Sequence, residues 1–140
     1  MREEYIDELL SAVLLEVQKK YRYMGEVQRL TKELGAGLSS DDKLVASMVL
    51  EMRGKELERV SNCDSLIQRF LPGAPEDIQD KVNAALRGKM PADIAGEEEN
   101  VMWQQIVDTV QATKRIWEQT VEIDKILSHR LAGEDSYYRK

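Results

Sequence analysis

Apolar residues recur at steps of three and four along the last long stretch of the chain, residues 97–132. Such spacing predicts one amphipathic helix with a single apolar seam, which Trp103 and Trp117 widen. At about 1.5 Å per residue the helix is roughly 54 Å long, so its apolar face needs partner helices of similar length. The seam consists of Met102, Ile106, Val110, Thr113, Ile116, Thr120, Ile123, Leu127 and Leu131.

A second seam runs through the start of the chain, at about residues 3–34, with alternating steps of four and three. This heptad-like spacing predicts a second long helix. Gly35 and Gly37 are expected to end it, since glycine commonly stops helices. Its seam consists of Ile6, Leu10, Val13, Val17, Lys20, Met24, Val27, Thr31 and Leu34.

A third long helix is predicted from about residue 41 to Phe70. Ser39 and Ser40 precede Asp41 and Asp42, a pattern typical of an N-cap with acidic residues in the first turn. The connection to the helix at residues 3–34 is short, which favours an antiparallel hairpin of these two helices. The apolar seam consists of Val45, Met48, Val49 and Met52, then Leu57, Val60, Cys63, Ile67 and Phe70.

Two features of these helices have alternative interpretations. The third helix has no apolar side chain at residues 53–56, where Gly54 lies. We interpret this as a shift of the buried face, with a functional hinge as the alternative. The methionines of the seams are interpreted as ordinary core, although flexible thioethers can also line an adaptable groove for a partner. They are Met24, Met48, Met52 and Met102.

A short helix is predicted between the third and last long helices. Pro72 and Pro75 must break the preceding helix, and Pro75 suits the first position of a new one. Its apolar face ends at Arg87 and Gly88, and a loop then leads to Gly96. The predicted fold is therefore all-α, an elongated antiparallel helical bundle or coiled coil of three long helices plus one short helix. Residues 1–133 form its single domain, and residues 134–140 are expected to be a flexible tail.

Composition agrees with long solvated helices. The 140 residues are 42% hydrophobic and 33% charged, with 8 Gly and 3 Pro. The net charge of −6 argues against nucleic acid as a partner, because phosphate binding needs clustered Lys and Arg. No stretch is apolar enough for insertion into a membrane, and the acidic N-terminus is unlike a secretory signal. Together with the lone Cys63, interpreted as a packing residue, this favours a cytoplasmic location.

No pattern in the chain indicates catalysis. A di-metal helical bundle needs repeated Glu residues and Glu-x-x-His motifs, yet the one histidine, His129, follows Ile126 by three residues. Cys63 has no histidine near it in the sequence, and no glycine-rich phosphate loop is present. We therefore expect no enzyme activity, no metal and no cofactor.

The remaining class is a protein-binding bundle. Three long seams and one short helix can either close on themselves or leave a groove that accepts a helix from a partner. The competing hypothesis is a homodimer with a structural or regulatory role unrelated to secretion. It predicts a dimer that depends on protein concentration, and a loss of helicity when Ile123 or Leu127 is replaced by a charged residue.

Three stretches form a recognisable pattern in the order of the elements: residues 44–51 and 55–59 in the third helix and residues 106–127 in the last, which a tyrosine-containing tail follows. This pattern resembles the FlgN family of flagellar export chaperones. The resemblance implies a cytoplasmic, non-enzymatic chaperone that binds hook-filament junction proteins before export, mainly through its C-terminal helix. The implied contact residues are Trp117, Ile123, Leu127 and Leu131, assisted by Tyr137 and Tyr138.

Overall fold

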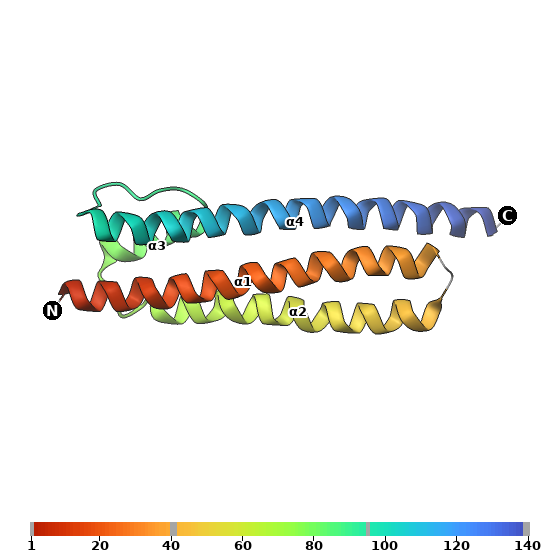
Figure 1. The fold of residues 1–140 in the computed structure, drawn as a ribbon, viewed down its shortest axis with the longest axis horizontal. Helices are drawn as coiled ribbons and strands as arrows, with labels where there is room; N and C mark the ends of the chain where they lie inside the picture. The colour runs from red at the N-terminus through yellow and green to blue at the C-terminus, as the bar shows by residue number, and fades with distance from the viewer. Residues whose placement is uncertain (1, 40–41, 95, 139–140) are drawn as a thin grey trace.

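The protein consists of four helices, α1 (Arg2–Ser39), α2 (Lys43–Phe70), α3 (Glu76–Leu86) and α4 (Glu97–Tyr138) (Figure 1). This computed structural model describes residues 2–39, 42–94 and 96–138, and the side chains of residues 4–38, 42–94 and 96–130. Within these ranges there is no strand. The prediction of an all-α bundle with three long helices and one short one is confirmed.

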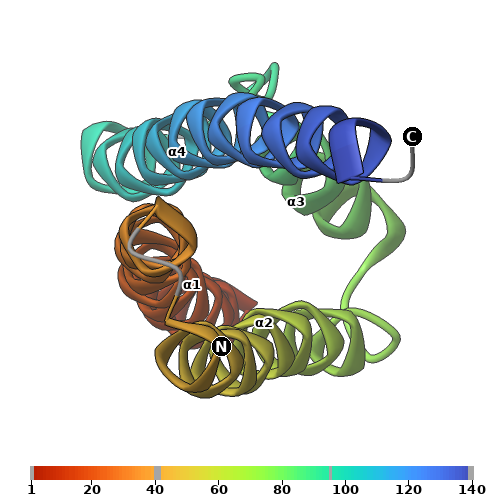
Figure 2. The same ribbon diagram turned by 90° about the vertical axis from the view of Figure 1, so that its right-hand side faces the viewer.

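The first helix, α1, is the centre of the bundle. It packs on α2 along one side and on α4 along the other, while α3 packs on α4. Helices α1 and α2 form the predicted antiparallel hairpin, whereas α4 runs in the same direction as α1 (Figure 1). This direction follows from the connection, because residues 87–94 lead the chain back along the bundle after α3 (Figure 1). Viewed from the end, α2, α1, α4 and α3 follow one another around a common axis (Figure 2).

The core reflects the central position of α1. Leu10, Val13, Val27 and Leu30 are completely or almost completely buried, since two helices cover them. The largest core cluster lies where α3 is present and includes Trp103 of α4. The other members that α3 and α4 contribute to this cluster are Ile78, Val82, Ala85, Ile106 and Val107.

Buried threonines are part of the seams without leaving an unsatisfied hydroxyl. The hydroxyl of Thr31 donates to the carbonyl of Val27 over 2.7 Å, one turn earlier in α1. Thr113 and Thr120 of α4 form the same bond, at 2.9 and 2.7 Å. Each hydroxyl is thus satisfied within its own helix, so a polar residue at a seam position does not interrupt the packing.

The prediction that glycines end the first helix is wrong. Helix α1 passes through Gly35 and Gly37 and reaches Ser39. A Cβ atom added to Gly35 would lie 3.0 Å from Cδ2 of Leu127, and one on Gly37 would lie 3.5 Å from Cγ1 of Val45. Gly35 therefore permits close packing of α1 on Leu127 of α4, which can offset the ~1 kcal/mol that glycine costs in a helix, whereas the distance at Gly37 is an ordinary van der Waals contact that alanine would also allow.

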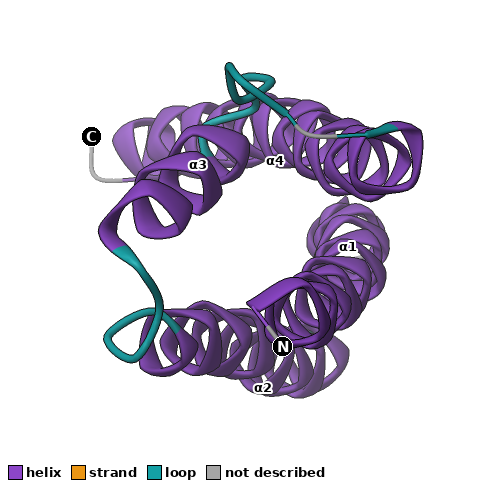
Figure 3. Ribbon diagram, turned by 90° about the vertical axis from the view of Figure 1, so that its left-hand side faces the viewer, coloured by secondary structure: helices purple, strands orange, loops and turns teal. Residues whose placement is uncertain are grey.

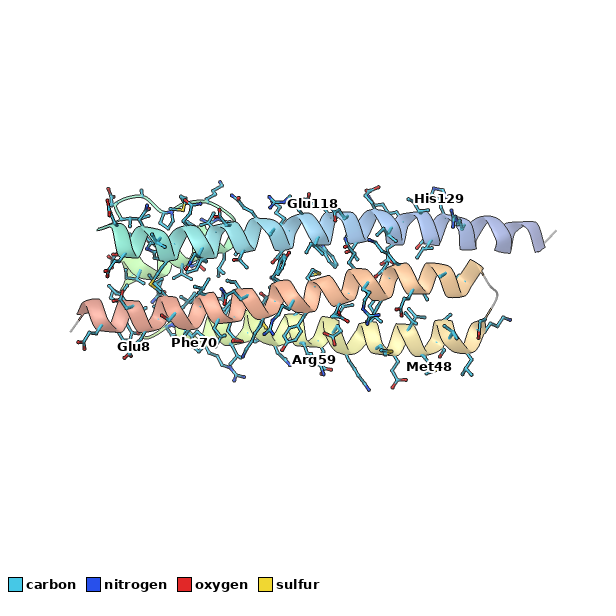
Figure 4. The ribbon with its side chains drawn as sticks, viewed as in Figure 1. Glu8, Met48, Arg59, Phe70, Glu118 and His129 are labelled. Atoms are coloured by element: carbon cyan, nitrogen blue, oxygen red, sulfur yellow. The ribbon has the colours of Figure 1, made fainter. Side chains whose placement is uncertain are left out.

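Helix α2 begins two residues later than predicted from the serines. Its N-cap is Asp42, whose carboxylate accepts a hydrogen bond from the backbone N–H of Val45 over 3.1 Å. The helix continues through Gly54 without interruption. The interpretation of every methionine as core is wrong, because Met48 and Met52 are 55% and 47% exposed. Met48 lies on the edge of α2 away from the other helices (Figure 4).

The short helix α3 ends in a Schellman motif at the predicted position. Gly88 has φ of 82°, and its N–H donates to the carbonyl of Ala85. The N–H of Lys89 donates to Ala84, which completes the pair of bonds that defines this motif. The side-chain amide of Gln111 in α4 donates to the carbonyl of Gly88 over 2.8 Å. The end of α3 is thereby attached to α4.

The last helix is longer than predicted. It continues past Ala132 and through Gly133 to Tyr138. A single glycine costs a helix only about 1 kcal/mol, which is too little to stop one of this length. The predicted tail at residues 134–140 is therefore helical as far as Tyr138, and its last two residues, 139 and 140, lie outside the described part of the chain.

Candidate functional site

A groove runs along the bundle between α2 and α4, with α1 as its floor. It exists because α2 and α4 each pack on α1 but hardly on each other. In an end view, α3 lies on the side of α4 away from α1, across from α2 (Figure 3). This is the position of a fourth helix in a four-helix bundle. Helix α3 has 11 residues and α2 has 28, so α3 fills that position along only part of its length.

The open part of this position has a volume of about 820 Å³. We call it the α2–α4 groove. Its apolar lining is Val17 and Met24 of α1, Leu57, Val60 and Ile67 of α2, Leu86 at the end of α3, and Val110 and Trp117 of α4. Volume and apolar character are both typical of a binding site.

Two tryptophans of α4 differ in burial according to their position relative to α3. Trp103 and Trp117 are separated by two heptads and therefore lie on nearly the same face of the helix. Trp103 has no exposed surface, and its indole N–H donates to the Glu99 carboxylate over 3.2 Å. Trp117, beyond the end of α3, is 45% exposed and lines the α2–α4 groove. The apolar face of α4 thus continues past the helix that buries it.

Charged side chains at the α3 end of the groove are unbalanced. Lys20 of α1 forms an ion pair with Asp64 of α2, at 2.8 Å. Arg87, Lys89 and Lys114 also line the groove, but none of them has an ion-pair partner among the side chains that the structure describes. This end of the groove is cationic although the whole chain has a net charge of −6.

An ion pair crosses the bundle at the other end of the groove. Nη1 of Arg53 in α2 lies 2.9 Å from Oδ1 of Asp124 in α4. The same nitrogen donates to the Thr31 hydroxyl of α1 over 3.3 Å. Arg53 is about one turn beyond Leu57 in α2, and Asp124 is about two turns beyond Trp117 in α4. The pair therefore closes the groove on this side.

The contact residues implied by the family resemblance do not lie together. Trp117 lines the groove, whereas Ile123 and Leu127 line a smaller cavity of about 350 Å³ between α1 and α4. Leu127 is buried against Gly35 within its own chain. The side chains of Leu131, Tyr137 and Tyr138 lie outside the part whose side chains are described.

Other residues of the groove were not singled out from the sequence as a site. Leu57 was identified only as a seam residue and Arg87 only as the end of the short helix, and neither Lys89 nor Lys114 was identified as a site residue. Their sequence positions are far apart, so no motif joins them. The sequence contained one indication of a groove: the predicted short helix could not cover apolar seams that are several turns longer than itself.

The candidate reactive residues lie apart from one another. His129 is exposed on the side of α4 away from the other helices (Figure 4). Cys63 is buried in α2. Within residues 2–39, 42–94 and 96–138, no group of three or more His, Cys, Asp or Glu residues is arranged to hold a metal ion. The same ranges contain no helix that is both long enough and apolar enough to span a membrane.

The Cys63 thiol is expected to react slowly in the native protein. Burial raises its pKa, and the negative charge of Glu16 adds to this effect, so the reactive thiolate is scarce. With Ellman's reagent at pH 8, the native protein should react at least about 100-fold more slowly than the protein unfolded in urea. Equal rates in the two states would mean that Cys63 is accessible and that the packing of α1 on α2 differs here.

Comparison of the chain with protein-family models, with curated proteins and with solved structures gives no match. The fold and the α2–α4 groove therefore define the class of the protein. The chain is a helical bundle in which one short helix occupies part of the fourth position.

Proposed function

We propose that the protein is a non-enzymatic binding protein that accepts a helix of a partner protein in the α2–α4 groove. The observation that supports this most directly is the contrast between the two tryptophans. Trp103 is buried in the core cluster to which α3 contributes, while Trp117 on the same face of α4 is half exposed beside other apolar side chains. A partner helix seated beyond α3 would bury Trp117 as α3 buries Trp103, and buried aromatic residues contribute strongly to binding.

Within this class we propose a cytoplasmic flagellar export chaperone for hook-filament junction proteins. The support is the likeness to the FlgN family in the order and length of the helices, together with an open apolar surface on the C-terminal helix. A chaperone of this kind needs such a surface to cover an apolar segment of its client before export. The proposed contact on α4 is centred on Trp117, because Leu127 is already covered by α1.

The test is direct binding of the full-length protein to purified hook-filament junction proteins of the source organism, measured by calorimetry. We expect a 1:1 complex that Trp117→Asp abolishes. The matched control is Val101→Asp, which introduces the same charge on the same helix at an apolar residue that is 54% exposed and lies outside the groove. Circular dichroism should show unchanged helicity for both variants. No binding by the original protein would refute the chaperone function.

A second candidate function is self-association through α2. Leu44, Val45, Met48 and Met52 are all exposed on α2, and Met48 and Met52 are one turn apart. Exposed apolar patches of this kind often mark interfaces between proteins. This alternative predicts a dimer in sedimentation that Met48→Asp dissociates. A monomer at all concentrations would exclude it.

A further inference from the structure

We propose that the groove selects an amphipathic helix of about three turns that carries carboxylates at one end, where they pair with Arg87, Lys89 and Lys114. This inference rests on the proposed binding function and adds the length and charge of the segment that is bound. It is carried by the dimensions of the α2–α4 groove and by the unpaired cations at one end of it.

The length follows from the two ends of the groove. On α2 its lining extends from Leu57 to Gln68, which is roughly 16 Å or about three turns of helix. The end of α3, attached by Gln111 to α4, closes one side. The ion pair between Arg53 and Asp124 closes the other. A longer helix would have to displace one of these two attachments.

The chain itself shows how a helix occupies this position. Helix α3 places Ile78, Val82 and Ala85 in the core that contains Trp103, and all three are buried. Their spacing of four and three is that of one helical face. The open groove continues the same position with apolar side chains from all four helices, so an apolar helical face is the shape that fits it.

The charge follows from cations that have no ion-pair partner among the side chains that the structure describes. Asp64 is the only acidic side chain in the groove lining, and it is paired with Lys20. Arg87, Lys89 and Lys114 therefore remain available at the α3 end. Carboxylates on the bound helix would complement them and would fix its orientation, whereas Lys or Arg at that end would be repelled.

The experiment uses two fluorescein-labelled peptides of about 11 residues, the three turns that the groove accommodates, with the same leucine seam. One begins with two Glu residues, which also suits the N-terminal end of a helix dipole, and the other begins with two Lys residues. Fluorescence anisotropy with the full-length protein at low salt should show at least about tenfold tighter binding of the Glu peptide. Raising the salt concentration should reduce this preference, because exposed charges are screened.

Charge reversal in the protein provides the matched variants. Lys114→Glu should remove or invert the preference for the Glu peptide. Lys125→Glu is the control, since it makes the same change on α4 outside the groove at a lysine that is 68% exposed. Helicity of both variants is checked by circular dichroism. A preference that Lys114→Glu leaves unchanged would overturn the assignment of the cations.

The remaining outcomes separate this inference from the proposed function. If both peptides bind equally and Trp117→Asp abolishes both, the groove binds helices but the inferred charge selection is wrong. If neither peptide binds while a junction protein still binds in a Trp117-dependent way, the three-turn helix is the wrong occupant and the binding function stands. A dimer of the protein alone that Trp117→Asp dissociates would make a second copy the occupant and overturn the inference.

Discussion

Trp103→Ala is expected to lower the free energy of unfolding by about 3–5 kcal/mol, whereas Trp117→Ala should cost about 1 kcal/mol or less. Both variants replace a tryptophan of α4 by alanine. The difference between their losses of unfolding free energy therefore reports how completely other helices cover each side chain. Trp103 has no exposed surface, and its loss would leave a cavity between α1, α3 and α4. Trp117 borders the open groove and would leave none.

Urea denaturation followed by circular dichroism gives both values. The slope of unfolding free energy against urea concentration should stay the same in the two variants, which would show that both expose the same surface area on unfolding. Equal losses of stability would contradict the structure. A large loss at Trp117 in particular would mean that another part of the chain, or a second copy, already covers the groove.

The second large effect is expected for Val82→Asp in α3. Val82 has no exposed surface and belongs to the cluster that contains Trp103. A carboxylate there would be buried without a partner, at a cost of about 3 kcal/mol or more. Because α3 packs mainly on α4, we expect α3 to detach while the α1–α2 hairpin stays helical.

Fluorescence quenching measures this detachment. In a Trp117→Phe background, Trp103 is the only tryptophan, and Val82→Asp should make it accessible to iodide. Asn83→Asp is the matched control, because it introduces the same charge at the next residue of α3, which is only half-buried. If Trp103 remains shielded in the Val82 variant, α3 is not what buries it, and the groove has a different extent.

The groove connects these results with function. A helix that is too short for its position leaves apolar surface exposed to water. This exposure is unfavourable in free energy, and binding of a partner would remove it. Detachment of α3 would extend the groove along α4 as far as Trp103. The Val82 variant is thus also a way to ask whether a longer helix can then bind.

The local pattern of apolar and polar residues was sufficient to predict much of the fold. The steps of three and four predicted the existence of all four helices, and Pro75 and Gly88 marked the two ends of the short one within a residue. Glycines were the main source of error, because a pattern cannot show whether a glycine stops a helix or admits a neighbour. Gly35 admits the side chain of Leu127, which is distant in the sequence.

The sequence by itself determined that the chain forms long amphipathic helices, that the first two make a hairpin, and that the connecting helix is short. Each of these properties depends on residues close together in the chain. Only the tertiary structure decided that α1 lies between α2 and α4, that α4 runs parallel to α1, and that Trp103 is buried while Trp117 is open. Periodicity identifies the apolar face of a helix, but burial depends on which distant helix covers that face and on where the covering helix ends.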